Sequence, residues 1–347
     1  MRIRRPGSGG TINGDYVMAG HSGTNRMAKA LRIIVVLGAI TPLFESTFAA
    51  NATGSPGKLA FTAKEDGGYE FDTGILRGGL RENGKNLGLT SAVHIPTDTA
   101  LNGTYGILSY YRVFTTNKRY GTAAWSWPGT SKLLPDGAVQ VTWPAADDRP
   151  FEMTSIYRFR DDSTLDVETI VKAGRDLSKF EVFLASYFHE AFPLTKVLVT
   201  PDSKIVGKRT FLTAKKSFGN WQMFPRGYDV LPIIRDGRWK KQPNPVDWKI
   251  MPLMAKPIAL RRGSKAAPTA ILMAPPDDCF AIATPYEGEG HYSTYFSLFG
   301  RDIKAGQTAR ARLRLVVKNI TSNREILNLY EKYMKDISEL AVQTDNP

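Results

Sequence analysis

The sequence predicts an all-β protein: a large antiparallel β-sandwich that ends in one α-helix. Beyond residue 57, short runs that alternate between polar and apolar residues recur with turn signals between them. This period of two is typical of half-buried strands. Between these runs we find no helical segments of roughly 10 to 15 residues, which argues against a βαβ architecture. Both observations favour two packed sheets.

The first part of the chain, residues 1–50, reads as an N-terminal extension and a signal peptide. Basic residues precede an apolar run over residues 33–44, and small residues follow at Ala49 and Ala50. This order is typical of a secretory signal, and the run is too short for a stable membrane span. We therefore expect export from a bacterial cell, to the periplasm or beyond, after cleavage near Ala49–Ala50. Met27 is an alternative start to Met1, and an uncleaved anchor is the alternative interpretation.

Residues 51–347 are expected to form a single β-sandwich domain, since no linker or internal repeat interrupts them. A core of this size needs no disulfide, and Cys279 is the only cysteine. The whole chain has 46 basic and 33 acidic residues. Residues 1–49 hold six of the basic and two of the acidic residues, so the rest of the chain has 40 and 31, a net charge of +9. That surplus favours anionic partners such as acidic glycans. No nucleic-acid motif appears, and no second apolar stretch suggests an integral membrane protein.

The predicted strands follow in order along the chain. Each is an alternating run bounded by Gly, Asp, Pro or Asn turns, as strands of a sandwich are. The last of them places three arginines on one face and small or apolar residues on the other. These runs are residues 138–143, 154–160, 164–171, 180–185 and 309–318.

The helix is predicted over residues 322–341. Ser322 to Glu325 form a capping box, in which the serine and glutamate side chains satisfy free N–H groups of the first turn. Apolar residues then recur at helical spacing, so one face should pack on the sandwich. That face holds Ile326, Tyr330, Met334, Ile337 and Ala341.

Three histidines beyond residue 50 are candidate acid/base groups: His94, His189 and His291. Each is predicted at a strand end or in a loop, and the last two have glutamates nearby. A carboxylate can hold an imidazole in one tautomer and make it a better base. For each histidine, the alternative is a structural role in which the ring bonds a nearby carbonyl. No metal motif such as HExxH is present, so we expect no metal cofactor, with calcium as the alternative.

Aromatic residues and arginines gather in two segments, 105–129 and 219–229. Sugar rings stack on aromatic planes, and the forked donors of arginine suit carboxylates and hydroxyls. We interpret both segments as loops at the mouth of a sandwich that bind a glycan. Some aromatic residues must instead fill the core, and Trp143 and Phe183 are assigned there. Cys279 is preceded by two aspartates and is a poor nucleophile.

The chain resembles the galactose mutarotase (aldose 1-epimerase) family. The stretch EVFLASYFHEAFPLTKVLVTPDSKIV is similar to the family segment in which a strand carries a histidine before Ser-Tyr-Phe. CFAIATPYEGEG and LFGRDIKAGQTARARLRLVV are similar to its C-terminal part, in which a glutamate strand precedes a Lys-Pro-Gly turn and a final strand. Tyr105 and Gly106, ahead of Arg112, resemble its His-Gly and arginine. The likeness covers about residues 60–318 and implies a mutarotase-like super-sandwich.

The sequence departs from the family at the residues that carry its chemistry. The family's histidines would fall on Ala185 and Tyr105, and its glutamate near Ala283, Thr284 or Glu287. The resemblance therefore implies the fold without the epimerase acid/base set. The same sandwich also hosts polysaccharide lyases and parts of glycosidases, and fold alone does not choose among activities.

The sequence thus predicts an exported carbohydrate-active protein, with an acidic glycan as partner and lyase, epimerase or hydrolase chemistry. The alternatives are a non-catalytic glycan-binding module of the cell envelope and a structural envelope protein. Tyr295 is an alternative to Tyr111 as a lyase-type proton donor. The expected catalytic residues are His189, His291, Glu287, Tyr111 and Arg112. The expected substrate-binding residues are His94, Trp125, Trp127, Glu190, Trp221, Arg226, Glu289 and Tyr295.

Overall fold

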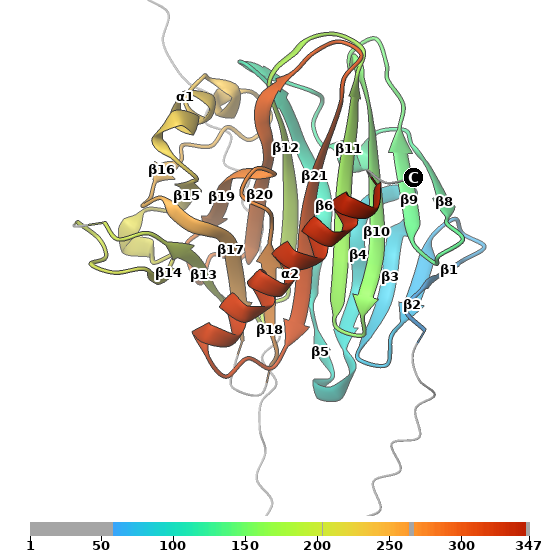
Figure 1. Cartoon of the computed structure of the whole chain (residues 1–347), viewed down its shortest axis with the longest axis horizontal. Helices are drawn as coiled ribbons and strands as arrows, with labels where there is room; N and C mark the ends of the chain where they lie inside the picture. Colours follow the sequence, from blue (N-terminus) through green and yellow to red (C-terminus); the bar gives the residue numbers. More distant parts are fainter. Residues whose placement is uncertain (1–57, 203, 264–266, 345–347) are drawn as a thin grey trace, which may run out of the picture. The chain divides into compact units, whose positions relative to one another are not determined.

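The computed structural model describes residues 58–202, 204–263 and 267–344, which belong to one compact unit. The predicted signal peptide lies outside the described residues. Two large sheets face each other, and α2 (Asn323–Thr344) crosses the outside of one of them (Figure 1). This arrangement confirms the predicted all-β sandwich with a C-terminal helix.

The first sheet has twelve strands, and its pairs are antiparallel except β15 with β16. Its main path, in spatial order, is β1 (Phe61–Ala63), β2 (Tyr69–Asp72), β3 (Leu76–Glu82), β4 (Lys85–His94), β6 (Asn102–Thr115), β12 (Leu177–Phe188), β20 (Ser293–Ile303), β19 (Cys279–Pro285), β15 (Trp221–Pro225) and β16 (Lys249–Ile250). Beside this path, β5 (Thr99–Ala100) pairs with β4, and β7 (Lys118–Arg119) with β6.

The second sheet has nine antiparallel strands. Their order is β14 (Thr210–Thr213), β13 (Leu194–Val199), β17 (Met254–Arg262), β18 (Thr269–Met273), β21 (Thr308–Lys318), β11 (Thr164–Ala173), β10 (Phe151–Asp161), β9 (Val139–Trp143) and β8 (Thr130–Leu133). Each of the five runs predicted from alternation lies within or overlaps one strand of this molecule. Four of them, all but residues 180–185, build this second sheet.

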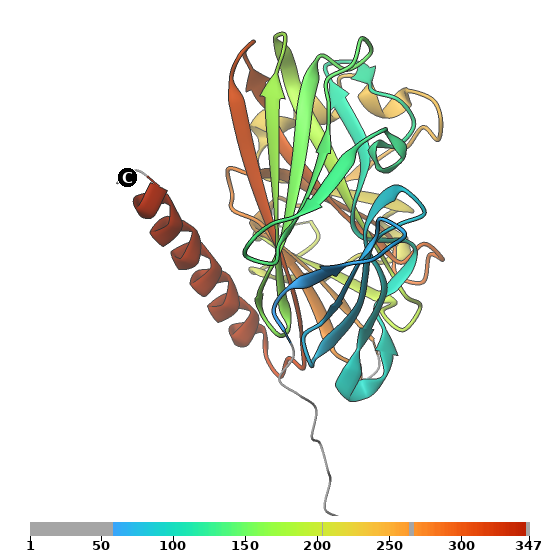
Figure 2. The ribbon, with the colours of Figure 1, turned by 90° about the vertical axis from the view of Figure 1, so that its right-hand side faces the viewer.

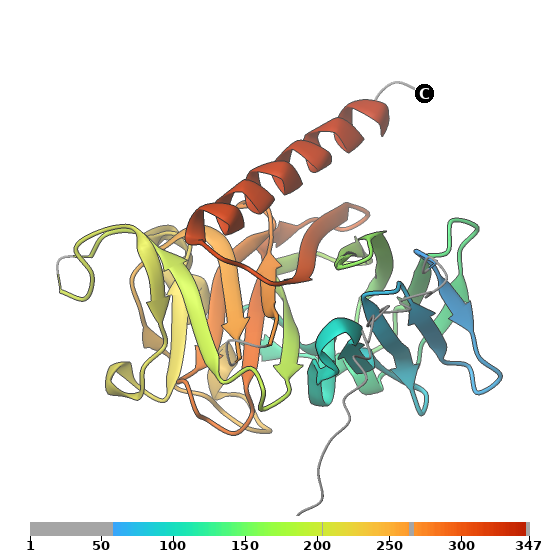
Figure 3. The same cartoon turned by 90° about the horizontal axis from the view of Figure 1, so that it is seen from below.

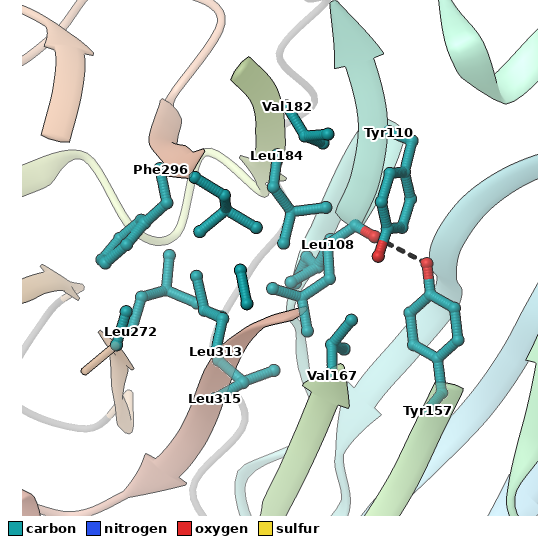
Figure 4. Close-up of a cluster of buried hydrophobic side chains, with 14 of the residues drawn as sticks. Leu108, Tyr110, Tyr157, Val167, Val182, Leu184, Leu272, Phe296, Leu313 and Leu315 are labelled. Carbon is teal, nitrogen blue, oxygen red and sulfur yellow. Dashed lines mark hydrogen bonds between the residues drawn. The ribbon is translucent and has the colours of Figure 1, made fainter. Parts of the chain in front are cut away.

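The main core lies between the sheets, where apolar side chains from both inner faces interlock (Figure 4). Leu108 and Leu184 come from the twelve-stranded sheet, and Val167 and Leu313 from the nine-stranded sheet. Tyrosine hydroxyls within this core find partners, as buried polar groups must. Tyr157 donates to the carbonyl of Leu108 at 2.9 Å. Trp143, assigned to the core, is buried here.

A second cluster of apolar side chains covers the outer face of the nine-stranded sheet. Ile326, Tyr330 and Tyr333 of α2 are buried there against strand residues such as Ile258 and Ile271. Figures 2 and 3 show α2 against the outside of the sandwich. At its start, the backbone N–H of Glu325 donates to Ser322 Oγ at 3.3 Å, which is one half of a capping box. The Glu325 carboxylate accepts from the N–H of Thr321 at 3.1 Å, one residue before the predicted partner.

A third cluster lies on the outer face of the twelve-stranded sheet, beneath a covering segment of residues 226–250. This segment contains α1 (Leu231–Ile234) and two short 3₁₀ turns. Trp239 packs edge-on against Phe114 and Phe183, with ring centroids 4.8 and 4.7 Å apart. Phe183 is therefore buried, as expected, but on this outer face rather than between the sheets. The aromatic surface beneath the segment holds the candidate site.

Candidate functional site

A β-bulge in β6 brings Tyr111 and Arg112 to the same face of the sheet. Opposite β12, Phe183 pairs with Arg112 and Leu184 with Tyr110, so Tyr111 is the extra residue. Tyr110 belongs to the inner core, while Tyr111 packs on the outer cluster and lines a cavity together with Arg112. A bulge breaks the alternation of faces in this way. Residues 105–115, expected to be a loop, are part of this strand.

Arg112 carries a positive charge that lacks an acidic partner. The side chain is 4% exposed, and none of the ion pairs among the described residues includes it. Its Nη2 donates to the Asn244 carbonyl at 2.8 Å and to Tyr111 Oη at 3.2 Å, whereas Nε and Nη1 have no hydrogen-bond partner. The guanidinium also lies over the rings of Tyr111 and Trp239, at 4.7 and 5.5 Å. A buried charge without a counter-ion is costly, so the site favours an anion.

Tyr111 is the phenol on which this charge acts. Burial by itself would raise its pKa. Three effects outweigh burial: the positive charge of Arg112, hydrogen bonds from Arg112 and Asn244, and the charge of Arg119. The pKa of Tyr111 is therefore lowered. The guanidinium of Arg119 lies 5.8 Å from the Tyr111 ring centroid. A phenol of lowered pKa in a cavity is a candidate acid/base group.

The cavity beside Tyr111 and Arg112, here called the central cavity, has a volume of about 320 Å³. Aromatic side chains from four strands and the covering segment form its walls, as is common in ligand sites. Besides Tyr111 and Arg112, it is lined by Phe183, Tyr187, Trp221, Asn244, Pro245, Val246, Trp248, His291 and Tyr295. Burial raises the pKa of Tyr295 to about 12, so this phenol stays protonated at physiological pH.

A row of stacked rings leads out of the central cavity. Trp125, in a 3₁₀ turn at Ala124–Ser126, lies between Tyr111 and Tyr105, with centroids 4.8 and 5.6 Å away and planes nearly parallel. Tyr105 is 44% exposed, which is unusual for a large aromatic residue in a strand. Stacked, partly exposed rings present a flat surface to the apolar face of a sugar.

His291 and Glu289 form a pair at the rim of the central cavity. His291 Nδ1 lies 2.7 Å from Glu289 Oε1, and the backbone N–H of His291 donates to the other carboxylate oxygen at 3.0 Å. The carboxylate thus orients the imidazole, as in general acid/base sites. Glu287, which was expected to be catalytic, makes no side-chain hydrogen bond with any described residue, and its backbone N–H donates to the Ala214 carbonyl.

An adjacent cavity of about 260 Å³ shares His291 and Tyr187 with the central one. His189 and Glu190 line it, at the end of β12, and so does Tyr105. The Nδ1 of His189 accepts from the backbone N–H of Ala191 at 3.1 Å, and no described residue bonds its Nε2. Two of the three histidines therefore lie at neighbouring cavities on one face of the sheet.

Arg261 of β17 holds both histidine-bearing loops from beneath. Its guanidinium donates to the carbonyls of Phe192 and Pro193, which follow His189, at 3.3 Å each. It also donates to the Ser293 carbonyl, two residues after His291, and to Thr284 Oγ1. The side chain is 1% exposed, so a single buried arginine ties the two loops together.

The covering segment, which walls the central cavity, is anchored by a buried ion pair. Arg238 Nη1 donates to Glu181 Oε2 at 2.7 Å, and both side chains are fully buried. Asp236 accepts from Arg238 as well, at 2.8 Å from Nη2. Burial opposes ionisation of Glu181, so the pKa of its carboxyl is raised. The positive charge of Arg238 lowers this pKa, and the negative charge of Asp236 raises it. This network fixes the segment that presents Asn244 and Trp248.

Four residues expected at the site lie elsewhere. His94 is buried, its Nδ1 bonds Thr97 Oγ1 at 2.8 Å, and burial lowers its pKa. Trp127 belongs to the inner core, with the Arg149 guanidinium 4.4 Å from its ring. Arg226 follows β15 at the strand end remote from Trp221 and donates to the Pro276 carbonyl. Glu287 lines neither cavity described above. Trp221 itself lies in strand β15, which the sequence suggested was a loop.

Sequence reasoning missed Tyr187, Asn244 and Trp248, whereas Arg119 lies in the segment 105–129 that was expected to bind a glycan. Tyr187 follows Ser186 in the SYF motif, so the motif itself could have marked it. Asn244 and Trp248 lie in the Pro-rich stretch after residue 241, which carries no chemical motif. Only long-range folding brings that stretch over β6.

Within the described residues, no group of three His, Cys, Asp or Glu side chains is arranged to hold a metal ion. No described helix is both long and apolar enough to cross a membrane. Burial raises the pKa of Cys279 far above its usual value, so this thiol stays protonated.

No protein-family model matches the chain, and no curated protein sequence matches it either. Among solved structures, it is similar to a candidate aldose 1-epimerase from Escherichia coli K12, with 10% identity over 71% of this chain and 96% of that one, at a TM-score of 0.39.

Two larger proteins are similar over part of their length. A mutant heparan sulfate lyase from Pedobacter heparinus is 7% identical, with 76% of this chain and 37% of that chain covered and a TM-score of 0.43. An alpha-N-acetylgalactosaminidase from Bifidobacterium bifidum is 10% identical, with 82% and 38% covered and a TM-score of 0.44. At these scores the likeness carries no argument about activity.

Proposed function

We propose that this chain is a carbohydrate-active enzyme that cleaves an acidic glycan by β-elimination in the central cavity. The observation that carries the proposal is the buried Arg112 guanidinium, which has no acidic partner among the described residues and lies beside a phenol of lowered pKa. A carboxylate of a uronic acid unit would supply the missing counter-charge. Surrounding rings suit the faces of a sugar.

Each side chain has a separate part in the proposed reaction. Arg112 neutralises the substrate carboxylate, which makes the adjacent C–H group more acidic. Tyr111, as phenolate, takes the proton from that carbon, and the electron pair left behind forms a C=C bond. The bond between the neighbouring carbon and the glycosidic oxygen breaks. Tyr295, which remains protonated, donates its proton to that oxygen. His291, oriented by Glu289, binds the sugar at the rim.

Export through the predicted N-terminal signal would bring such an enzyme to extracellular or envelope glycans. The mechanism uses protein side chains only, because Arg112 supplies the charge that a calcium ion would otherwise provide. We therefore expect a chelator to leave the rate unchanged. If a chelator abolishes activity and added calcium restores it, calcium is a cofactor, which is the alternative.

The test is incubation with hyaluronan, chondroitin, heparan sulfate, polygalacturonate and alginate, followed by absorbance of unsaturated uronate and by new reducing ends. Tyr111→Phe removes the acid/base hydroxyl and should lower the rate by about 10²–10⁴-fold, the usual size of such a contribution. Tyr228→Phe is the matched control, because Tyr228 is 75% exposed and lies outside the central cavity. An active Tyr111→Phe variant would exclude the assigned role, and absence of both binding and product with all five polymers would overturn the proposal.

A non-catalytic glycan-binding module is the second candidate, favoured by the stacked Tyr105, Trp125 and Tyr111 rings. It predicts binding of one of these polymers without any product, and equal affinity in the wild type and Tyr111→Phe.

A further inference from the structure

A third cavity continues the row formed by the central and adjacent cavities. This distal cavity, of about 560 Å³, shares Gly103 and Thr104 with the adjacent one, and the adjacent one shares Tyr187 and His291 with the central one. It is also lined by Glu82, Thr90, Ser91, Ala92, Val93, Ala100 and Asn102. The three cavities therefore adjoin one another along the outer face of the twelve-stranded sheet.

The row is long compared with one sugar unit. It reaches from β4, which lines the distal cavity, to β15, which carries Trp221 in the central cavity. Five steps between neighbouring strands separate β4 from β15 in the order of the sheet, and at ~4.8 Å per step the row extends roughly 24 Å. Each cavity alone has about the size of a small-ligand site.

The walls of the adjacent and distal cavities suit uncharged hydroxyl groups. Thr90, Ser91 and Thr104 offer hydroxyl groups, and Glu82 and Glu190 offer carboxylates. No lysine or arginine is among the residues that line these two cavities. Tyr105, backed by Trp125, adds an exposed ring over the adjacent cavity. Such a combination of rings, hydroxyl groups and carboxylates, which accept hydrogen bonds from sugar hydroxyls, fits further uncharged sugar units.

On the other side of the central cavity the groove is closed. Val246 and Trp248 of the covering segment line both the central cavity and a fourth cavity of about 410 Å³. Unlike Thr104 and His291, which are exposed where the other cavities meet, these two side chains are partly buried and stand between the two cavities. Trp248 is fixed by edge-on packing against Trp239 and Trp221, at 5.2 and 6.0 Å. The fourth cavity, whose lining includes Arg235, Lys240, Asp247 and Lys249, therefore lies behind a wall of packed side chains.

We propose that the substrate is an extended glycan chain that runs in one direction only. One acidic unit lies at Arg112, and the following units extend through the adjacent cavity to the distal cavity at β4. This inference rests on the proposed function and adds the length of the substrate and the side of the site on which it binds.

Oligosaccharides of hyaluronan, size-fractionated from two to eight units, test the inference. The readout is kcat/KM where the chain is cleaved and affinity where it is only bound. We expect at least about a tenfold increase from the shortest to the longest chains, or ~1.4 kcal/mol. Ala100→Trp fills the distal cavity and should reduce the value for long chains to that for short ones. Thr104→Trp, at an exposed position of the same cavity, is a second variant in case the first folds poorly.

Lys249→Glu is the matched control, because it changes the fourth cavity behind the Trp248 wall. It should leave the increase with chain length intact. Equal values for all chain lengths, or an increase abolished by Lys249→Glu but not by either tryptophan variant, would overturn this inference and leave the proposed function standing. Failure of the enzyme to bind or cleave any chain would instead overturn the proposed function.

Discussion

The residues around Arg112 show how one bulge creates a candidate site. In a regular strand Tyr110 and Arg112 would share a face, and the guanidinium would enter the inner core. The extra residue Tyr111 reverses that parity, so the phenol and the guanidinium both face the central cavity. Their identities could be read from the sequence and were. Their common face could not, because a bulge depends on how β6 pairs with β12.

Arg119 offers a test of the acid/base role of Tyr111. Its charge helps to lower the pKa of Tyr111, so Arg119→Gln should raise that pKa. If the phenolate accepts the proton, the rising limb of the pH–rate profile should then move to higher pH, while the maximal rate changes little. The measurement is kcat/KM against pH on a cleaved polymer. An unshifted profile would exclude Tyr111 as the base.

Asp278 provides a pH-dependent test of stability. Its burial raises the carboxyl pKa from 3.8 to about 6, while the backbone N–H of Arg312 bonds its ionised form. The pKa of Asp278 is higher in the folded state than in the unfolded state, so folding favours the protonated carboxyl. This contribution to stability is complete below about pH 4 and is lost as pH rises from about 4 to 6. A difference of about two units corresponds to at most ~3 kcal/mol.

Asp278→Asn should therefore stabilise the protein at pH 7, and this gain should shrink toward pH 4. Chemical denaturation at several pH values measures both effects. Asp277→Asn is the control, since Asp277 is exposed. A constant difference between the Asp278 variant and the wild type at all pH values would contradict the raised pKa.

At the scale of elements, alternation predicted those strands that expose one face to polar surroundings or ion pairs. In β21, Arg312 and Arg314 pair with Glu168 and Asp166 of β11, which explains the basic face of the predicted strand. Strands β6 and β15 were instead interpreted as loops. Both are buried over most of their length on both faces, and a strand buried on both faces shows no polar and apolar period of two.

The covering segment depends on the Arg238–Glu181 pair. Arg238→Met leaves the buried Glu181 carboxylate without its partner and should destabilise the protein by roughly 3–5 kcal/mol. Glycan cleavage should fall as well, because the segment positions Asn244 against Arg112. Replacing both residues, Glu181→Leu with Arg238→Met, should recover much of the stability. Urea unfolding of the single and double variants gives the comparison.

The matched control for this cycle is Lys240→Met, since the Lys240–Asp247 pair is exposed and should contribute little. If the Arg238 variant were as stable as the Lys240 variant, the buried pair would not anchor the segment.

For the whole molecule, charge and cavity position act together. The basic surplus should attract an acidic polymer, and the buried Arg112 should then bind one of its carboxylates. We expect affinity for hyaluronan to fall as salt concentration rises, because ions screen the surface charges. Binding measured across a salt series, with neutral dextran as control, tests this. A salt-independent affinity would show that the overall charge takes no part.

By itself the sequence determined the class of the fold, the terminal helix and most residue types of the candidate site. These follow from short-range order: alternation, helical spacing and capping act among residues close in the chain. Only the tertiary structure decided that Glu289 rather than Glu287 orients His291, that His94 and Trp127 are buried, and that residues 244–248 wall the cavity beside Tyr111. The reason is physical: strand register, bulges and loop placement are fixed by pairings between segments far apart in sequence, and those pairings leave no local pattern.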